Sequence, residues 1–312
     1  MSMEESQNSQ EACYLCGSLS IARSKNRRAI KFKRIHKYFK CADCNSYSLF
    51  PKLKVDELND LYSIKYIDNV NPKSTNQEQI TENRFLKLQE ILQQTDHKQT
   101  KRFLDYGCGS SAEVVSFASK LEYQSFGVEV EEGTRQEAQV NSGCKIFSPE
   151  EVLASGHQFD IIFLGDVLEH LNDPLTTLDQ VSSLLASEGL LVIQGPLEGA
   201  FTVSNLLLSI KANILSKSPS MFPPYHVTLA TKDSIVKALN INKFVVKKMF
   251  ITEPLWPAPK FGSKASLASP GSLIFSVAKI FDIALSKVSK YYGTRFFLLA
   301  KPRNLVKAEI NY

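Results

Sequence analysis

The sequence predicts an α/β protein in which a mostly parallel sheet, covered by helices on both faces, follows a small cysteine-rich module. Two observations carry this prediction. From residue 101 onward, short apolar runs alternate with helical stretches, and two Cys-x-x-Cys pairs occur near the N-terminus. The alternation is typical of parallel strands joined by covering helices. The length of 312 residues allows one main domain with smaller attachments.

The first element is a predicted metal-binding module at residues 13–50, after a polar, acidic tail at residues 1–12 that we expect to be disordered. Cys13 and Cys16 form one pair, and Cys41 and Cys44 form the other. Four thiolates suit the tetrahedral coordination that Zn²⁺ prefers, and they leave no position open for water. We therefore expect a structural zinc ion bound as in a zinc ribbon, in preference to a redox-active dithiol.

The segment between the cysteine pairs is basic and predicts a β-hairpin with strands at 30–35 and 37–40. Residues 17–40 hold nine Lys or Arg and no Asp or Glu. Such a surface attracts phosphates, nucleic acid or anionic lipid. Nucleic-acid binding, with Tyr38 and Phe39 stacking on bases, is one interpretation. A solvated hairpin face is the favoured one.

The next elements are a helical connector at residues 51–100 and an α/β domain at residues 101–312. Two helices are expected in the connector, at 55–62 and 76–94, and the apolar spacing of the second indicates packing on the sheet. The predicted strands of the domain are 102–106, 125–129, 145–147, 160–164, 190–194, 243–250 and 294–300. Two insertions, 197–230 and 251–293, are expected to form helical caps.

The most informative motif follows the first strand of this domain, where Asp105 leads into Gly107-Cys108-Gly109. Glycines at this place let a ligand approach the backbone, and the next helix offers free N–H groups to it. Taken alone, this loop suits a dinucleotide equally well. Glu129 ends the second strand, where a carboxylate can accept two ribose hydroxyls.

The domain resembles the class I S-adenosylmethionine-dependent methyltransferases in four segments: LDYGCG, FGVEV, FDIIFLGDVLEHLNDP and GLLVIQGP. The resemblance covers about residues 76–251 and implies a Rossmann-like sheet whose last strand is antiparallel. It implies S-adenosylmethionine as the cofactor, with contacts from Asp105, Gly107, Cys108, Gly109, Glu129, Asp166 and Val167. The double cysteine pair in front of such a domain also resembles bacterial methyltransferases that modify sugars or surface polysaccharides.

Methyl transfer also needs a group that takes the proton of the acceptor. His170, in the segment Glu169-His170 after the fourth strand, and His226 are the candidates. Asp166, Glu169 and His170 formally match a divalent-cation motif of ubiquinone-pathway O-methyltransferases. For His170 we favour an orienting role over a base, and a base over a metal ligand. His226 lies in a segment that resembles the one that reaches the acceptor in related sugar methyltransferases. A role as base or acceptor ligand and a packed structural role are equally supported for it.

The second insertion predicts an amphipathic helix at 272–290 with lysines nearby. This helix either packs on the domain, which is the favoured interpretation, or lies on an anionic membrane. No stretch is apolar and long enough to span a membrane. The N-terminus lacks the pattern of a secretory signal, so we expect a cytoplasmic protein.

The net charge of +5 conceals a strong asymmetry. Residues 45–231 hold fourteen Lys or Arg against twenty-four Asp or Glu, whereas residues 232–307 hold fourteen against three. The basic blocks favour an anionic acceptor. We therefore expect methyl transfer to a small molecule or glycan, such as a nucleotide- or lipid-linked sugar. The alternatives are an RNA methyltransferase, a non-catalytic scaffold that binds S-adenosylmethionine, and a nicotinamide oxidoreductase. The oligomeric state is not predicted.

Overall fold

The computed structural model describes residues 11–25, 27–62, 77–94, 101–215, 219, 225–254 and 270–303. Almost all of the predicted N-terminal tail lies outside these residues, as do parts of the connector and of both insertions. Among the described residues, no helix combines the length and the apolar character that crossing a membrane would need.

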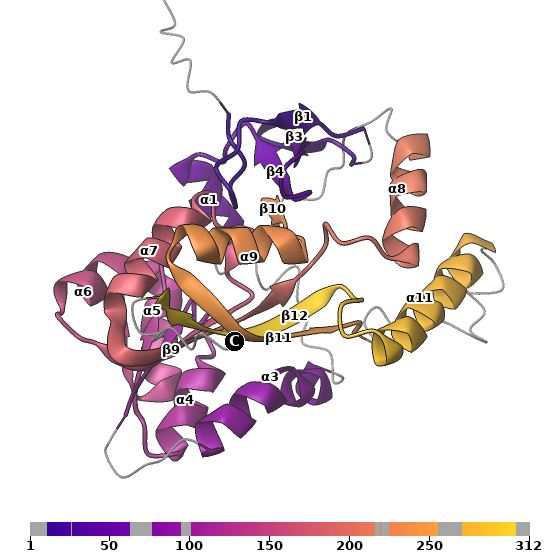
Figure 1. The fold of residues 1–312 in the computed structure, drawn as a ribbon. Helices are drawn as coiled ribbons and strands as arrows, with labels where there is room; N and C mark the ends of the chain where they lie inside the picture. Colours follow the sequence, from indigo (N-terminus) through magenta and orange to yellow (C-terminus); the bar gives the residue numbers. More distant parts are fainter. Residues whose placement is uncertain are drawn as a thin grey trace, which may run out of the picture.

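The centre of the molecule is a large sheet, part of which is labelled in Figure 1. It has seven strands in the order β11-β12-β9-β8-β5-β6-β7. Strands β5 to β9 pair in parallel, and β12 pairs antiparallel with both β9 and β11, as the resemblance implied. The order reverses between β5 and β8, which is where open α/β sheets bind ligands. The strands are β5 Arg102–Tyr106, β6 Gln124–Val128, β7 Lys145–Phe147, β8 Phe159–Gly165, β9 Leu185–Pro196, β11 Phe244–Thr252 and β12 Arg295–Pro302.

Helices cover both faces of this sheet because alternate strand residues point to opposite sides. Phe103 and Phe163 pack with Leu88 and Leu92 on the face of α3, whereas Ile162 faces the other way. The first face carries α3 (Gln77–Gln94), α4 (Glu113–Lys120) and α5 (Glu132–Ser142). The second carries α6 (Pro149–Ala154), α7 (Pro174–Leu184) and α9 (Lys232–Ile241).

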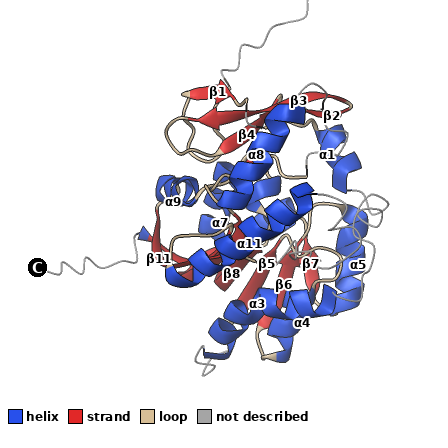
Figure 2. Ribbon diagram, turned by 90° about the vertical axis from the view of Figure 1, so that its right-hand side faces the viewer, coloured by secondary structure: helices blue, strands red, loops and turns tan. Residues whose placement is uncertain are grey.

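A second, smaller sheet lies above α7 and α9 and contains the N-terminal module (Figures 1 and 2). Its order is β1-β3-β4-β10, with β2 paired to β3. Strand β10 comes from the first insertion and pairs with β4 through Thr228↔Ser48 and Leu229↔Tyr47. The module therefore shares a sheet with a distant part of the chain. The strands are β1 Ile21–Arg23, β2 Ile30–Phe32, β3 Arg34–Cys41, β4 Tyr47–Phe50 and β10 Thr228–Leu229.

The predicted hairpin exists, but its turn was placed wrongly. The chain turns at Lys33, whose φ of 53° makes a reversal between Phe32 and Arg34, and not at His36. His36 lies within β3 and is fully buried, with its Nδ1 2.8 Å from the carbonyl oxygen of Pro51. An inward position on the long strand β3 accounts for the burial of this histidine.

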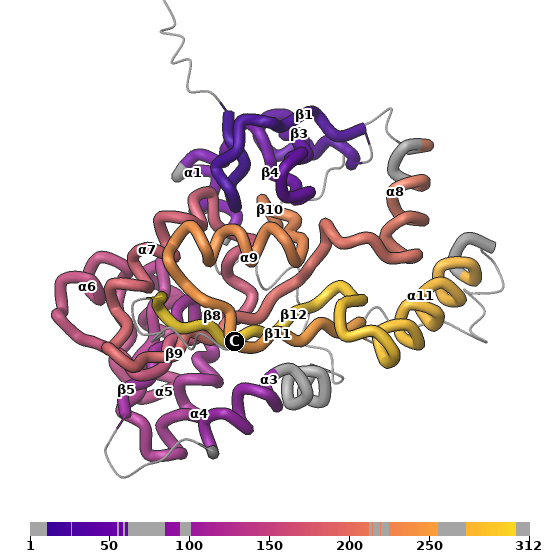
Figure 3. The backbone as a smooth tube through the Cα atoms, viewed as in Figure 1, coloured from indigo at the N-terminus to yellow at the C-terminus, as the bar shows by residue number. Residues whose placement is uncertain are grey.

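The remaining elements agree with the predicted ones to within a few residues. Helix α1 spans Val55–Tyr62, and β9 begins five residues before the predicted strand because the chain enters it directly from α7. The two insertions each contribute one long helix, α8 (Val203–Leu215) and α11 (Pro270–Val288). These two helices contact each other on one side of the molecule, outside both sheets (Figure 3).

The packing of Phe163 gives a stability prediction. Its ring is almost fully buried on the α3 face and meets Phe85 edge-on at 6.1 Å between centroids. Phe163→Ala should lower the free energy of unfolding by about 3–5 kcal/mol, because it leaves a cavity that the sheet cannot close. Urea denaturation measures this loss. The control Val140→Ala, at an exposed site on α5, should change it by less than about 0.5 kcal/mol.

Candidate functional site

The loop after β5 has a backbone conformation that requires glycine, and the backbone of Gly109 has open space beside it. Gly107 and Gly109 have φ of 89° and 62°, in the left-handed region that favours glycine. A Cβ on Gly107 would lie 2.6 Å from Cγ2 of Val167, so any side chain there would displace the end of β8. Asp105, just before the loop, is buried at the end of β5. The structure therefore brings three of the predicted cofactor residues to one edge of the sheet.

Glu129 joins this loop from the neighbouring strand. Its Oε2 accepts a hydrogen bond from the backbone N–H of Gly109 at 3.1 Å, and its Oε1 accepts one from Val130 at 2.8 Å. These bonds hold the carboxylate at the carboxyl end of β6, where it was predicted to meet a ribose. The side chain of Cys108 lies instead against Gly127 of β6. The thiol of Cys108 therefore points toward β6.

Asp166 and Val167 follow β8 at the same edge. Asp166 adopts a φ of 56°, and its Oδ1 accepts a hydrogen bond from Nη2 of Arg295 at 2.6 Å. Arg295 begins β12, and the sequence reasoning did not identify it. The cofactor roles of these two residues stay predictions, but the carboxylate of Asp166 is engaged with a guanidinium and does not join Glu169 and His170. The formal three-residue metal motif is therefore not assembled as predicted.

A metal role was the least favoured prediction for His170. The structure brings His170 and His226 together, with their ring centroids 5.0 Å apart. Nδ1 of His226 lies 2.7 Å from Oε2 of Glu198, and Nδ1 of His170 lies 2.6 Å from the carbonyl oxygen of Tyr225. If each Nδ1 carries the hydrogen, each Nε2 keeps a lone pair. Glu169 is the third member, and one ligand atom from each of these side chains lies within 4.8 Å of the others. The cluster can hold a proton or bind a divalent cation.

Glu198 and His226 shift the pKa values of each other in opposite directions. Burial disfavours the charged form of His226, but the hydrogen bond and charge of Glu198 outweigh burial and raise its pKa above the usual 6.5. Burial also opposes the ionisation of Glu198, yet His226 keeps the pKa of that carboxyl below its usual value. Glu169 differs, because complete burial raises its pKa to about 7.

Comparison with known proteins decides the family. A family profile described as a methyltransferase domain matches residues 80–244, which is more than half of the chain. The chain belongs to the methyltransferase domain family. The matched region begins in α3, contains all of the strands β5 to β9, and includes every residue predicted to contact the cofactor.

Individual relatives of this methyltransferase domain are distant. A ubiquinone biosynthesis O-methyltransferase of Ruegeria sp. (strain TM1040) is 33% identical over 96 residues, 28% of this chain and 38% of that relative. Magnesium protoporphyrin IX methyltransferase of Synechocystis PCC 6803 is 15% identical, with 78% of this chain and 97% of that chain covered and a TM-score of 0.48. A SAM-dependent methyltransferase of Archaeoglobus fulgidus is 15% identical, with 77% and 100% covered and a TM-score of 0.47.

In front of the methyltransferase domain, the four predicted cysteines converge. Their sulfur atoms all lie within 4.8 Å of one another, with 3.5 Å between Cys13 and Cys44 and 3.6 Å between Cys16 and Cys41. Four sulfurs at the corners of a zinc tetrahedron are about 3.8 Å apart. The cluster also contacts the rest of the chain, because the hydroxyl of Thr231, the N-cap of α9, donates to the carbonyl oxygen of Cys44 at 2.7 Å.

A cavity of about 420 Å³ separates the N-terminal module from the histidine pair. Three parts of the chain line it: Arg27, Arg28 and Tyr38 of the module, Asn205 and Leu208 of α8, and Glu198 and His226 of the methyltransferase domain. The two arginines thus turn toward the domain, whereas the favoured prediction placed the basic hairpin in solvent. Sequence reasoning missed Glu198 as well, although an acid just after β9 occupies the ligand-binding edge of the sheet.

The Glu198–His226 pair gives a prediction that needs no substrate. Glu198→Gln removes the charge that stabilises the imidazolium, so the pKa of His226 should fall toward or below 6.5. A titration of the histidine ring protons by NMR measures this pKa. The control Glu137→Gln, at an exposed position of α5, should leave it unchanged. A His226 pKa that is equal in the wild type and Glu198→Gln would contradict the pairing.

Proposed function

We propose that this chain transfers a methyl group from S-adenosylmethionine to a small-molecule acceptor bound in the cavity beside His226. The observation that carries the proposal is that the glycine loop after β5 and the cavity beside His226 are connected through the residues that follow β8. Val167 abuts the Gly107 loop, and His170, three residues further along the chain, lies beside His226, which lines the cavity. A ligand on the glycine loop and a second ligand in the cavity would therefore approach each other at the end of β8.

The residues of the loop fit the cofactor that the family resemblance implies. The glycine backbone admits the methionine part, Asp105 would hold its ammonium, and Glu129 would exchange its bond to Gly109 for the ribose hydroxyls. When bound, this cofactor supplies a methyl group already activated on a sulfonium. The protein then has to align the acceptor and to remove its proton.

We assign to His226 the role of the base that accepts the proton of the acceptor. Its Nδ1 is held by Glu198, and its backbone carbonyl accepts a hydrogen bond from the hydroxyl of Tyr38 at 2.6 Å, so the ring is fixed from two sides. A hydroxyl of the acceptor can donate to Nε2, and the proton that arrives there is stabilised by Glu198. His170, fixed by the carbonyl of Tyr225, orients the neighbouring ring. A divalent cation between Glu169, His170 and His226 is the alternative use of these atoms.

The acceptor class is proposed from the charge of the cavity. Arg27 donates to the carbonyl of Glu198 at 2.7 Å and lies over the ring of Tyr47, while its buried Nε has no hydrogen-bond partner among the described residues. Arg28 lines the same cavity. Guanidinium groups there suit a phosphate. We therefore favour a phosphate-bearing sugar, nucleotide- or lipid-linked, over RNA, because these arginines line the same cavity as His226. The name of the ubiquinone relative agrees with a small acceptor.

We also propose that the four cysteines bind a structural zinc ion. Four thiolates complete a tetrahedral site, so such an ion has no position for a reactant and acts through the fold. The ion would link Cys13 and Cys16 to Cys41 at the end of β3 and to Cys44. It would thereby stabilise the module that contributes Arg27, Arg28 and Tyr38 to the cavity.

Two substitutions should separate cofactor binding from chemistry. Glu129→Ala should weaken the binding of S-adenosylhomocysteine by at least about tenfold, because two hydroxyl contacts to a carboxylate are lost. His226→Ala should keep that affinity and lower kcat by about 10²- to 10⁴-fold. Calorimetry measures the first effect. Transfer of labelled methyl groups to a panel of uridine- and thymidine-diphosphate sugars measures the second.

The same panel tests the acceptor class. Arg28→Ala should raise KM for phosphate-bearing acceptors and leave the affinity for S-adenosylhomocysteine unchanged, and Lys120→Ala on α4 serves as the control. Tight binding of NAD without binding of S-adenosylhomocysteine would refute methyl transfer. Binding of S-adenosylhomocysteine with transfer only to RNA would refute the sugar acceptor alone.

The zinc proposal predicts one metal ion per chain. Protein purified without chelators should contain one equivalent of zinc by elemental analysis, and Cys41→Ser should lose it and melt at a lower temperature. Cys144→Ser, outside the cluster, is the control. Absence of zinc from the wild-type protein, with four titratable free thiols, would count against the site.

A further inference from the structure

Helix α11 buries three polar residues on its inward side and exposes a row of apolar residues on its outward side. On the side that packs against the protein, Ser276, Lys279 and Asp282 are each no more than 4% exposed. On the opposite side, five large apolar residues are each 47–57% exposed: Leu273, Ile274, Val277, Ile280 and Phe281. A helix on the surface of a globular protein normally has the reverse arrangement. The outward face of α11 therefore fits an apolar environment better than water.

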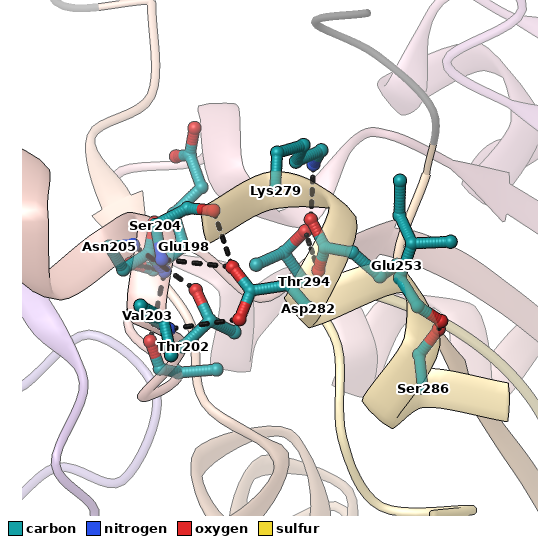
Figure 4. A network of polar contacts seen from close by, with 12 residues as sticks. Glu198, Thr202, Val203, Ser204, Asn205, Glu253, Lys279, Asp282, Ser286 and Thr294 are labelled. Carbon is teal, nitrogen blue, oxygen red and sulfur yellow. Dashed lines mark hydrogen bonds and ion pairs between the residues drawn. The ribbon is translucent and has the colours of Figure 1, made fainter. Parts of the chain in front are cut away.

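The inward polar residues are fully engaged, so their burial is part of the fold (Figure 4). Asp282 accepts hydrogen bonds from the backbone N–H groups of Val203 and Ser204, at 3.0 and 2.8 Å, and thereby caps the N-terminus of α8. Lys279 forms an ion pair with Glu253, which also accepts a hydrogen bond from Thr294 at 2.8 Å. These bonds fix the rotation of α11 about its axis and leave its apolar stripe outside.

The apolar face has the spacing of a single continuous stripe. Positions 273, 274, 277, 280 and 281 follow the i, i+1, i+4, i+7, i+8 pattern, which places them on one side of an α-helix. The neighbouring helix α8 adds Leu206, Ile210 and Ile214, spaced by four residues and 44%, 48% and 72% exposed. Exposed apolar residues gathered in this way mark interaction surfaces.

The charge of this helix pair indicates what covers the stripe. Lys211, Lys287 and Lys290 are exposed on α8 and α11 or directly after α11, and over residues 201–215 and 270–294 Asp282 is the one acid among the described residues and is buried. An apolar stripe with surrounding lysines and no exposed acid is complementary to an anionic bilayer surface.

We infer that α8 and α11 form a docking surface for an anionic lipid membrane. The apolar stripe inserts at the level of the headgroups, and the three lysines contact lipid phosphates. Leu208 and Asn205 of α8 also line the cavity. If the proposed acceptor site is correct, docking holds the cavity near the membrane, because α8 contributes to both, and the acceptor is a sugar phosphate carried on a lipid. Lipid binding itself does not depend on the proposed methyl transfer.

Vesicle sedimentation with the full chain tests the inference. Vesicles of phosphatidylglycerol and phosphatidylcholine should bind the protein, vesicles of phosphatidylcholine alone should bind it much more weakly, and added salt should release it. The double variant Ile274→Glu, Phe281→Glu should weaken binding by at least about tenfold, and Lys287→Glu by about fivefold or more. Val140→Glu, at an 82% exposed apolar site on α5, is the matched control and should bind like the wild type.

Three results would overturn the inference. These are no binding of the wild type to anionic vesicles, equal binding of the double variant, and a wild-type dimer that Phe281→Glu dissociates without any vesicle binding, which would assign the face to a second copy. Affinity for S-adenosylhomocysteine, measured on the same variants, should remain unchanged. If the wild type does not bind S-adenosylhomocysteine, the methyltransferase proposal is refuted, but the conclusion on lipid binding is unaffected.

Discussion

The pairing of β10 with β4 is the contact on which the rest of the site depends. This short strand is joined to the N-terminal module through Thr228 and Leu229, while the backbone N–H of Val227 donates to the carbonyl oxygen of Glu169 at 2.8 Å. Residues 227–229 thus form hydrogen bonds with both the N-terminal module and the methyltransferase domain. His226 stands next to it and consequently lies between the module and the large sheet. Without this pairing, the cavity would lose a wall and His226 its position.

A series of charged side chains connects the two halves of the proposed site. Arg295 pairs with Asp166 at the cofactor edge, and its charge also acts on Glu169, which in turn acts on His226. A change of charge at the cofactor edge is therefore felt at the histidine pair through the intervening carboxylates. Such coupling suits a reaction in which a sulfonium charge disappears while a proton is taken up nearby.

The parts of the site that the sequence predicted are those with a local pattern. The glycine loop, Asp105 and Glu129 each stand at the end of a strand, and strand ends follow from apolar runs. Glu198 and Arg295 were missed because their partners lie 28 and 129 residues away and leave no periodic trace. His36 had a local signal that was overlooked, since it and Tyr38 occupy alternate inward positions of β3. For α11 the spacing predicted an apolar stripe but not which side of the helix faces the protein. That orientation depends on the hydrogen bonds between Asp282 and the N-terminus of α8.

The hydroxyl of Thr231 links the cysteine cluster to helix α9, so the stability of the cluster affects the stability of the methyltransferase domain. This group both caps α9 and donates to the carbonyl of Cys44, so the backbone that positions a thiolate also positions a helix covering the large sheet. An ion that binds only the folded cluster adds its binding free energy to the folded state as a whole. The population of folded enzyme would then follow the availability of free zinc in its surroundings, with the active fraction varying even when the amount of protein stays constant.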